Sequence, residues 1–359
     1  MSKLKLGNYT KIKTGKLDAN ASVENGKYPF FTCSIQPLRI DNYSYDCECV
    51  LVAGNGDLNV KYYNGKFDAY QRTYIIESND KSKLEVPYLY YFLDSYIETL
   101  RKQSIGGVIK YIKLGNLTNA SIPLISVSEQ NKIVRILNRA KSIITHRKQQ
   151  LEKLDLLVKA RFVEMFGEPI LNEKGWNMVT IGDIVTEVKY GTSKPAVEGG
   201  KYPYLRMNNL TYDGHLDLTN LKMIDIPDSE IEKCIVHRGD VLFNRTNSIE
   251  LVGKTCVFDK DEDMVIAGYI IRVRLKSIML PIVLSYFMNT DALKKKLRNM
   301  AKGAVNQANI NAQEFKSINI YLPPIELQTQ FADFVKQVDK SRFITSKEKI
   351  RRVKFYDKF

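Results

Sequence analysis

Several residue patterns are missing from this chain of 359 residues, and each absence excludes a class of protein. No run of about 18 apolar residues is present, so we expect no membrane-spanning helix and no membrane partner. The amino-terminal stretch has no apolar segment followed by a cleavage site, so we expect no signal peptide. The 5 cysteines form no Cys-x-x-Cys pair, and only 3 histidines are present, which disfavours a disulfide framework and a zinc site. A cytoplasmic location fits this composition best.

Motifs of catalysis are also missing. The double proline in Leu322–Ile325 lacks the polar residue before it and the aromatic residue after it that a base-gripping methyltransferase loop needs. Gly253-Lys254-Thr255 could end a Walker A loop, but Ser248 stands where that loop requires glycine. No glycine-rich cofactor loop and no Ser-His-Asp order is found. We therefore expect no catalytic residues, no metal and no cofactor in this chain.

Positive charge, in contrast, is abundant. Lysine and arginine number 54 against 40 acidic residues, which gives a net charge of +14. Such an excess favours a polyanionic partner, because each phosphate that is neutralised releases counterions. Neither end of the chain carries a basic amphipathic anchor, so nucleic acid is favoured over a membrane surface.

The chain contains similar phrases in the same order in both halves. NGKYPFF begins at Asn25, and GGKYPYL begins at Gly199. GGVIKYIKLGNLTNASIPLISVSEQNKIV begins at Gly106, and GAVNQANINAQEFKSINIYLPPIELQTQF begins at Gly303. The offset between the copies grows from 174 (199 − 25) to 198 (310 − 112), so the second copy carries about 24 extra residues, expected in its middle. These ordered repeats predict an internal duplication.

Local patterns predict the elements of each half. CVLVAGN, TYIIES, DVLFN and GYIIRVRL are typical of short strands. VPYLYYFLDSYIETLRKQ and LPIVLSYFMNTDALKKKLRNM each predict one helix opened by a proline. Apolar residues in heptad steps predict a helix from about Ser128 to Phe166, roughly 58 Å long, and a second long helix from Pro324.

These elements predict a mixed α/β fold (α+β) with a pseudo-twofold internal repeat. We expect a first recognition domain at residues 1–127, a central long helix at 128–167, a second recognition domain at 168–323 and a carboxy-terminal long helix at 324–359. The two long helices would pair as an antiparallel coiled coil.

Four segments carry a resemblance to a known family. They are HRGDVLFNRTNS (His237 to Ser248), the segment from Gly303 to Gln328, its counterpart from Gly106, and GWNMVTIGDIV, which opens the second half. In this order, with alternating globules and long helices, they resemble the DNA specificity subunit of a type I restriction–modification system. IPLISVSEQ departs from the pattern, because it lacks the LPP that precedes the second long helix.

The resemblance implies a subunit without a catalytic site. Each recognition domain would read one half of a bipartite, asymmetric site in double-stranded DNA. The long helices would set the spacing and hold two methylation subunits, which carry S-adenosylmethionine. Restriction subunits would join them and use ATP and Mg for translocation and cleavage.

Clusters of arginine, lysine, asparagine and glutamine are the candidates for DNA contact, because these side chains read base edges and bind phosphates. The first half contributes a basic, aromatic stretch that looks rich in turns, and a later lysine-containing loop: Asn55, Lys61, Tyr62, Tyr63, Asn64, Lys66, Gln71, Arg72, Lys110, Tyr111 and Lys113. The second half contributes Arg206, Asn208, Asn209, Arg245, Thr246, Asn247, Ser248, Lys302, Gln307 and Asn309. For any one of these residues, an exposed loop side chain is the simpler interpretation, and GDVLFNRT could recur to shape the fold.

Other functions remain open at this point. The specificity subunit of a two-subunit restriction enzyme that cuts on both sides of its site would share every feature above. A non-catalytic scaffold, or an RNA-binding protein, would also account for the long helices and the positive charge.

Overall fold

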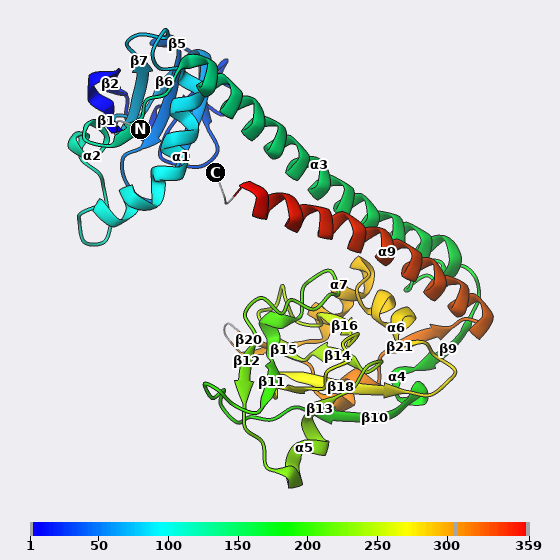
Figure 1. Ribbon diagram of the computed structural model, residues 1–359. Coiled ribbons are helices and arrows are strands. Elements are labelled where there is room, and N and C mark those ends of the chain that lie inside the picture. The colour runs from blue at the N-terminus through cyan, green and yellow to red at the C-terminus, as the bar shows by residue number, and fades with distance from the viewer. Residues whose placement is uncertain (1–2, 305–306, 357–359) are drawn as a thin grey trace. The chain divides into compact units, whose positions relative to one another are not determined.

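The computed structural model describes residues 3–304 and 307–356 of the chain (Figure 1). It forms two compact units, Met1–Thr145 and His146–Phe359. The division falls within the long helix α3 (Val127–Phe166), so each unit contains a mixed α/β body and part of this helix. None of the helices in the described ranges combines the length and apolar character needed to cross a membrane.

The first unit is built on a six-stranded sheet. Its strand order is β2 (Thr10–Thr14), β7 (Thr73–Ser78), β5 (Tyr45–Ala53), β6 (Val60–Ala69), β3 (Tyr28–Phe31) and β4 (Leu38–Ile40). Helix α1 (Val86–Gln103) buries Leu89 and Leu93 against Val50 and Val52 of β5. A small sheet of β1 (Lys3–Lys5) and β8 (Ser121–Pro123) and the short helices η1 (Leu6–Asn8), η2 (Ala19–Ala21) and α2 (Leu114–Thr118) complete the unit.

The second unit repeats this plan with its central sheet divided in two. One sheet has the order β10 (Val185–Tyr190), β18 (Ile270–Leu275), β14 (Val241–Asn244) and β16 (Thr255–Val257). The other has β12 (Lys222–Ile224), β11 (Tyr202–Leu205), β17 (Met264–Ile266) and β13 (Ile235–Val236). Strands β16 and β17 together take the place of β6, because β14 pairs with β16 and β11 lies parallel to β17, as β3 does to β6.

Smaller elements surround these sheets. Strands β15 (Thr246–Asn247), β20 (Gln307–Asn309) and β19 (Lys302–Ala304) form one small sheet, and β21 (Asn319–Leu322) pairs with β9 (Asn177–Thr180) in another. The helices are η3 (Met207–Asn209), α4 (Ile181–Ile184), α5 (Asp228–Cys234), α6 (Pro281–Met288), α7 (Asp291–Met300), α8 (Ala312–Lys316) and α9 (Ile325–Tyr356).

Matching main-chain hydrogen bonds confirm the internal repeat. In the first unit, Gly54 N donates to Arg72 O at 2.8 Å, and Ile112 N donates to Gly54 O at 2.9 Å. In the second unit, Arg245 N donates to Tyr269 O at 2.9 Å, and Ile310 N donates to Arg245 O at 2.9 Å. Gly54 and Arg245 are therefore equivalent positions, as are Arg72 and Tyr269.

The extra residues of the second copy are not one insertion. Both Ile40 and Ile224 pair with the first residue of the neighbouring strand, which sets the offset there at 184 (224 − 40). The offset then rises to 191 (245 − 54) and to 197 (269 − 72) at the equivalent positions just described. The second copy is thus longer in three successive connections, the first of which contains η3.

A buried glutamine joins each long helix to its own domain in the same way. Gln130 Oε1 accepts from Glu85 N at 2.9 Å, and its Nε2 donates to Lys83 O and Ile125 O at 2.7 and 2.9 Å. Gln328 repeats this pattern with Leu280 N, Ile278 O and Pro323 O at 2.8, 3.0 and 2.8 Å. Both glutamines are 0% exposed. Each glutamine accepts from the main-chain N–H of the N-cap residue of α1 or α6. These bonds fix the angle at which the long helix leaves the domain.

One predicted helix is wrong. The segment from Leu280 to Met300 forms two helices, α6 and α7, separated at Asn289 and Thr290. Asn289 is buried, and its Nδ2 donates to Thr255 O at 2.6 Å and to Ser285 O at 2.8 Å. Thr290 has an extended backbone and forms the N-cap of α7. The helix breaks here because the Asn289 side chain donates to β16, a strand that is distant in the sequence.

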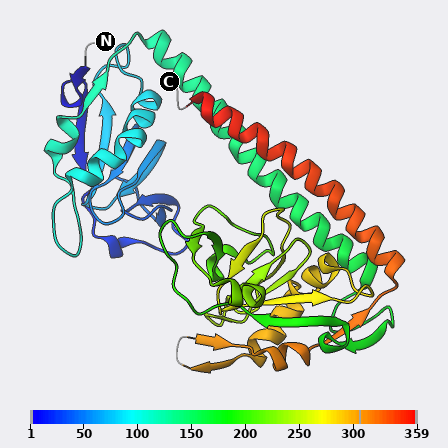
Figure 2. The same ribbon diagram turned by 60° about the horizontal axis from the view of Figure 1, so that its bottom comes forward.

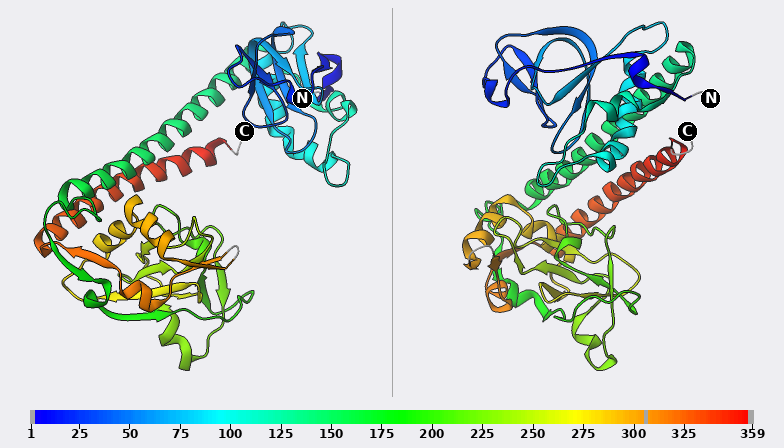
Figure 3. Two further views of the ribbon diagram at one scale, coloured as in Figure 1. Left: turned by 180° about the vertical axis from the view of Figure 1, so that it is seen from behind. Right: turned by 90° about the vertical axis from the view of Figure 1, so that its left-hand side faces the viewer.

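The two long helices run in opposite directions within the second unit. Figure 2 shows α9 lying along α3, and the rear view agrees (Figure 3). Arg161 of α3 lies over the Phe334 ring at 5.9 Å, and Asp155 pairs with Arg342, so higher numbers in α9 meet lower numbers in α3. Their apolar faces share one core with α6, which includes Phe162 of α3 and Phe331 of α9. The predicted long helices and their antiparallel contact are confirmed.

Candidate nucleic-acid interface

In the first unit, three separate segments meet at one end of the large sheet. Gly54 is the centre, because it donates to Arg72 O and accepts from Ile112 N. Gly56 N donates to Lys110 O at 2.9 Å, and Asn55 forms a bridge with Tyr111. We call this set the Gly54 loop cluster: residues 54–56, 70–72 and 110–112. Gly54 admits no side chain, since an added Cβ would lie 2.4 Å from Arg72 O.

The Gly54 loop cluster gathers about half of the candidates predicted for this unit. Gln71, Arg72, Lys110 and Tyr111 are exposed there, and Asn55 is half-buried. Lys61 lies close to the same end, because it pairs with Leu51 near the last residues of β5. Its Nζ bonds to Asn59 Oδ1, and burial lowers the pKa of Lys61. Lys113 follows the cluster as the exposed N-cap of α2.

The remaining candidates of this unit do not join them. The stretch predicted to be rich in turns is largely the strand β6, so neighbouring side chains point to opposite faces of the sheet. Tyr63 packs against Phe31 and Phe67, whereas Tyr62 packs against Tyr90 of α1 and donates to Glu48 Oε1 at 2.8 Å. Asn64 and Lys66 pair with Glu48 and Asp46, toward the far end of β5.

In the second unit, the equivalent end of the sheet contains a cavity of about 550 Å³. We call it the arginine cavity. Its walls come from the loop after β10, from β11 and η3, and from the connection between β17 and β18. It is lined by Thr192, Ser193, Lys194, Pro195, Ala196, Tyr204, Arg206, Met207, Asn208, Arg245, Ala267, Gly268 and Tyr269. Three predicted residues, Arg206, Asn208 and Arg245, are therefore brought together here.

Both arginines are held by the protein while keeping donors for a ligand. The Arg245 guanidinium lies over the Tyr190 ring at 4.9 Å, and its Nη1 donates to Gly268 O at 3.4 Å. Arg206 Nη2 donates to Asn220 O at 3.1 Å. The Nε atoms of both are buried without a hydrogen-bond partner among the described residues. Lys194 pairs with Glu230 at 2.9 Å, so the positive charge of the lining comes mainly from the two arginines, which suit phosphate oxygens or the acceptor edge of a base.

Other candidates in this unit are occupied within the fold. Asn209 is 2% exposed, its Oδ1 accepts from Arg206 N, and its Nδ2 donates to Asp217 O. Thr246 is buried and donates to Asn309 Oδ1 at 2.8 Å. Asn247 donates to Asn244 Oδ1 and accepts from Ser248 N, so these residues shape the turn after β14.

Two further candidates lie on the small sheet that also contains Thr246, Asn247 and Asn309. Gln307 is exposed at the start of β20. Lys302 begins β19, but its side chain lies outside the described residues.

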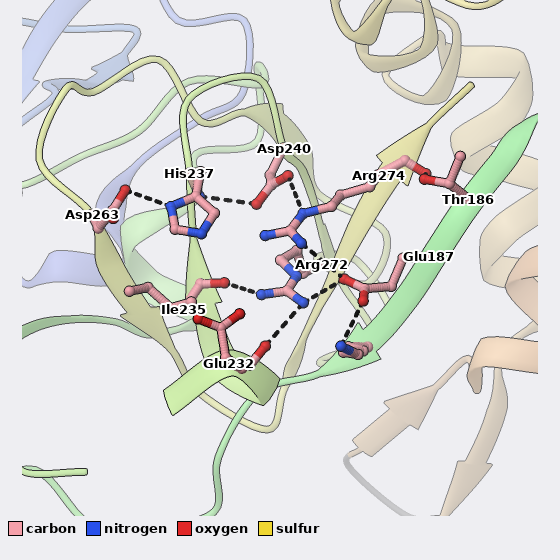
Figure 4. Close-up of polar contacts among 10 residues, drawn as sticks. Thr186, Glu187, Glu232, Ile235, His237, Asp240, Asp263, Arg272 and Arg274 are labelled. Carbon is pink, nitrogen blue, oxygen red and sulfur yellow. Dashed lines mark hydrogen bonds and ion pairs between the residues drawn. The ribbon is translucent and has the colours of Figure 1, made fainter. Parts of the chain in front are cut away.

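The HRGD part of the motif supports the fold. Figure 4 shows Asp240 accepting from His237 N at 2.9 Å and from Arg274 Nε at 3.0 Å, while His237 Nδ1 lies 2.7 Å from Asp263. Arg272 is 0% exposed and pairs with Glu187 and the main chain of α5 and β13. Burial acts to raise the pKa of Glu187, but the hydrogen bonds and positive charges of Lys189 and Arg272 together outweigh it. The pKa of Glu187 is therefore lowered. In this chain, the HRGD part of the motif therefore holds the sheet together.

Several residues of the arginine cavity were not predicted from the sequence. Lys194 and Tyr269 line it, and Tyr190 stacks under Arg245. Tyr269 occupies the position equivalent to Arg72, and this equivalence could have been found by aligning the two copies strand by strand. The stacking of Tyr190 depends on tertiary structure and left no signal in the sequence.

Metal binding has no support in the described parts of the chain, where no group of three or more His, Cys, Asp or Glu side chains could hold an ion.

Comparison with known proteins identifies a family. The model of the type I restriction modification DNA specificity domain matches residues 1–154 and 173–354. The EcoDI type I restriction enzyme specificity subunit of Escherichia coli is 39% identical over 156 residues, which cover 44% of this chain and 34% of the relative. The EcoKI specificity subunit of Escherichia coli (strain K12) is 26% identical over 259 residues, covering 68% of this chain and 56% of the relative. The chain thus spans between a third and little more than half of these curated relatives.

Two solved structures share the fold. A type I restriction–modification S subunit from M. genitalium superimposes with a TM-score of 0.63 at 16% identity, covering 99% of this chain and 94% of the other. A chain from a structure of the type I R-M system, concerned with complex assembly and conformational transition, gives a TM-score of 0.55 at 17% identity, covering 98% and 94%. At these identities the likeness describes the fold.

Proposed function

The chain belongs to the family of type I restriction–modification DNA specificity subunits, and from this premise we propose that it selects the DNA sequence on which a type I complex acts. It contributes no catalytic group of its own. The first recognition domain (1–127) reads one half-site through the Gly54 loop cluster, and the second (168–323) reads the other through the arginine cavity.

One observation carries this proposal: the same end of the same fold presents different side chains in the two copies. Gly54 and Arg72 of the first unit stand where the second has Arg245 and Tyr269. The guanidinium therefore comes from the turn before β7 in one copy and from the turn after β14 in the other. Two domains of the same fold can read different base sequences only if they present different hydrogen-bond donors at equivalent positions. The half-sites are accordingly different, and the full site is asymmetric.

The long helices supply the remaining parts of the function. Two methylation subunits, carrying S-adenosylmethionine, bind along α3 and α9, and restriction subunits join them with ATP and Mg. The buried glutamines Gln130 and Gln328 support this role, because they fix each helix to its domain. The helices at 128–167 and 324–359 thereby set the separation of the two half-sites.

Replacing one domain tests the proposal. Residues 1–127 are exchanged for those of a related subunit, and methylated motifs in the host genome are mapped by single-molecule sequencing. We expect one half of the motif to change while the other half and the spacer stay the same. A matched exchange of 168–323 should change only the other half. If either exchange alters both halves, the domains do not read independently, and the proposal is wrong.

A two-subunit restriction enzyme that cuts on both sides of its site is the alternative for the partner. Separate methylation and motor genes beside this gene favour the type I complex, whereas one fused nuclease–methylase gene favours the alternative.

A further inference from the structure

The hairpin from Ile105 to Tyr111 carries two strongly exposed aliphatic residues side by side, Val108 and Ile109. Val108 has a relative exposure of 104%, and Ile109 has 62%. Ile105 and Tyr111, at the base of the hairpin, are 43% and 37% exposed. Scattered apolar residues on a surface are ordinary. Val108 and Ile109 belong to none of the buried apolar clusters of this unit. An exposed apolar pair of this kind at a hairpin tip is typical of a surface that contacts a ligand.

The backbone holds this tip in place. Ile105 N donates to Tyr111 O at 3.0 Å, and Tyr111 N donates to Ile105 O at 2.8 Å. Gly106 has a φ of +113°, and an added Cβ would lie 2.6 Å from Ile109 O, so this turn requires glycine. These contacts fix the base of the hairpin, which reduces the conformational entropy lost when the tip meets a ligand.

The same hairpin is part of the proposed DNA surface. Lys110 O accepts from Gly56 N, and Ile112 N donates to Gly54 O, both at 2.9 Å. The apolar tip is thus continuous with the Gly54 loop cluster. Lys110 and Lys113 follow it directly, and the segment from Ser104 to Asn116 contains no acidic residue. Lysines beside an apolar tip are complementary to duplex DNA, which has phosphates on its outside and the apolar faces of stacked base pairs inside.

We propose that Val108 and Ile109 form a wedge that inserts between neighbouring base pairs of duplex DNA, a step that rests on the proposed DNA-reading function of this domain. Lys110 and Lys113 bind the phosphates on either side. Aliphatic wedges of this kind unstack a base step and kink the duplex by about 20–90°. The first domain then selects for base steps that unstack easily, in addition to the bases that its polar side chains contact.

The test uses the full chain in complex with its methylation subunits and a duplex that carries the mapped methylation motif. Energy transfer between dyes at the two duplex ends measures bending. 2-Aminopurine, placed in turn at each half-site position except the methylated adenine, measures unstacking. The methylated adenine is left out because methyltransferases extrude their target base. The variant Val108→Ser/Ile109→Ser is compared with Val108→Leu/Ile109→Leu, which keeps the tip apolar.

A second apolar pair in a turn provides the matched control. Ile170 and Leu171 are 52% and 67% exposed in the second unit, and Ile170→Ser/Leu171→Ser removes a similar apolar surface. We expect the wild-type, leucine and control proteins to bend the duplex and to raise 2-aminopurine fluorescence at one step of the first half-site. The serine variant of the tip should lose both signals and bind about tenfold more weakly.

Three results would overturn the wedge. If the wild-type complex binds its motif without bending or unstacking the first half-site, the tip does not insert, while the proposed reading function stands. If the serine variant of the tip no longer assembles with the methylation subunits, the tip is a protein-docking surface. Absence of any sequence preference in wild-type binding would instead remove the proposed function together with the wedge.

Discussion

The substitution Arg245→Lys distinguishes reading of a base from binding of a phosphate in the arginine cavity. Arg245 is half-buried, stacks on Tyr190 and has one long hydrogen bond, from Nη1 to Gly268 O at 3.4 Å. Its guanidinium is thus oriented by the protein and only weakly satisfied by it. Lysine keeps the positive charge but has neither a planar fork nor a comparable stacking surface.

The expected magnitude follows from this geometry. A bidentate contact between arginine and a guanine edge contributes about 1–3 kcal/mol of discrimination against other bases. Each 1.4 kcal/mol corresponds to about a factor of ten, so the ratio of specific to non-specific affinity should fall by about 5- to 150-fold in Arg245→Lys. The salt dependence of binding should stay the same, because the charge is retained. The loss should be confined to one position of the second half-site.

The assay is competition binding of the complex to the mapped motif and to duplexes with single base changes in the second half-site. Arg238→Ala is the control, because this exposed arginine pairs with Asp261 at 2.8 Å and does not line the cavity. The reasoning is refuted if Arg245→Lys keeps full discrimination while Arg245→Ala weakens binding to all sequences alike. In that case Arg245 contacts a phosphate.

Three further predictions follow from other parts of the chain. Gln328→Ala leaves one buried main-chain donor and two acceptors without their partner, so urea unfolding should show a loss of about 3 kcal/mol, and a loss under 1 kcal/mol would contradict the capping role. Burial lowers the pKa of Lys294 to about 8 from its ordinary value of 10.5. The unfolded chain therefore binds more protons between these values, and stability should rise as the pH increases from 8 to 10.5. Lys294→Met should flatten this rise in urea unfolding at a series of pH values, and an unchanged slope would contradict it. Insertion of four residues after Leu151 lengthens the helix by about 6 Å, so methylation mapping should show both half-sites unchanged and a spacer longer by one or two base pairs. An active variant with the original spacer would mean that the helices do not measure DNA.

The parts of the fold that the sequence predicts are those encoded by local or repeated patterns. Heptad spacing predicts a helix from about Ser128 to Phe166, and the structure has it at Val127–Phe166. The paired phrases predict the duplication, because Gly26 and Gly200 both lie close to the equivalent Ile40 and Ile224, and the aromatic residues that follow form the equivalent strands β3 and β11. The break at Asn289 was missed, since it depends on a bond to Thr255 O, which lies far away in the sequence.

Side-chain direction limits what could be predicted of the candidate site. The residues from Lys61 to Lys66 appear as one cluster in the sequence, but they alternate between the faces of β6. Asparagine is a residue type suited to reading bases, but both amide atoms of Asn209 are hydrogen-bonded to the main chain of Arg206 and Asp217. Neither outcome is visible until the strand register and the turn geometry are known.

The two buried glutamines also bear on how such a protein can evolve. Every hydrogen bond that Gln130 and Gln328 make to their own domains is to a main-chain atom. These hydrogen bonds therefore depend on the path of the backbone, whereas the packing of Phe331 against Tyr286 of α6 depends on side chains. A domain that keeps this backbone path can therefore carry divergent loops without losing the glutamine bonds. The loops that differ between the two copies are thus free to vary while each long helix keeps its bonds to the main chain of its domain.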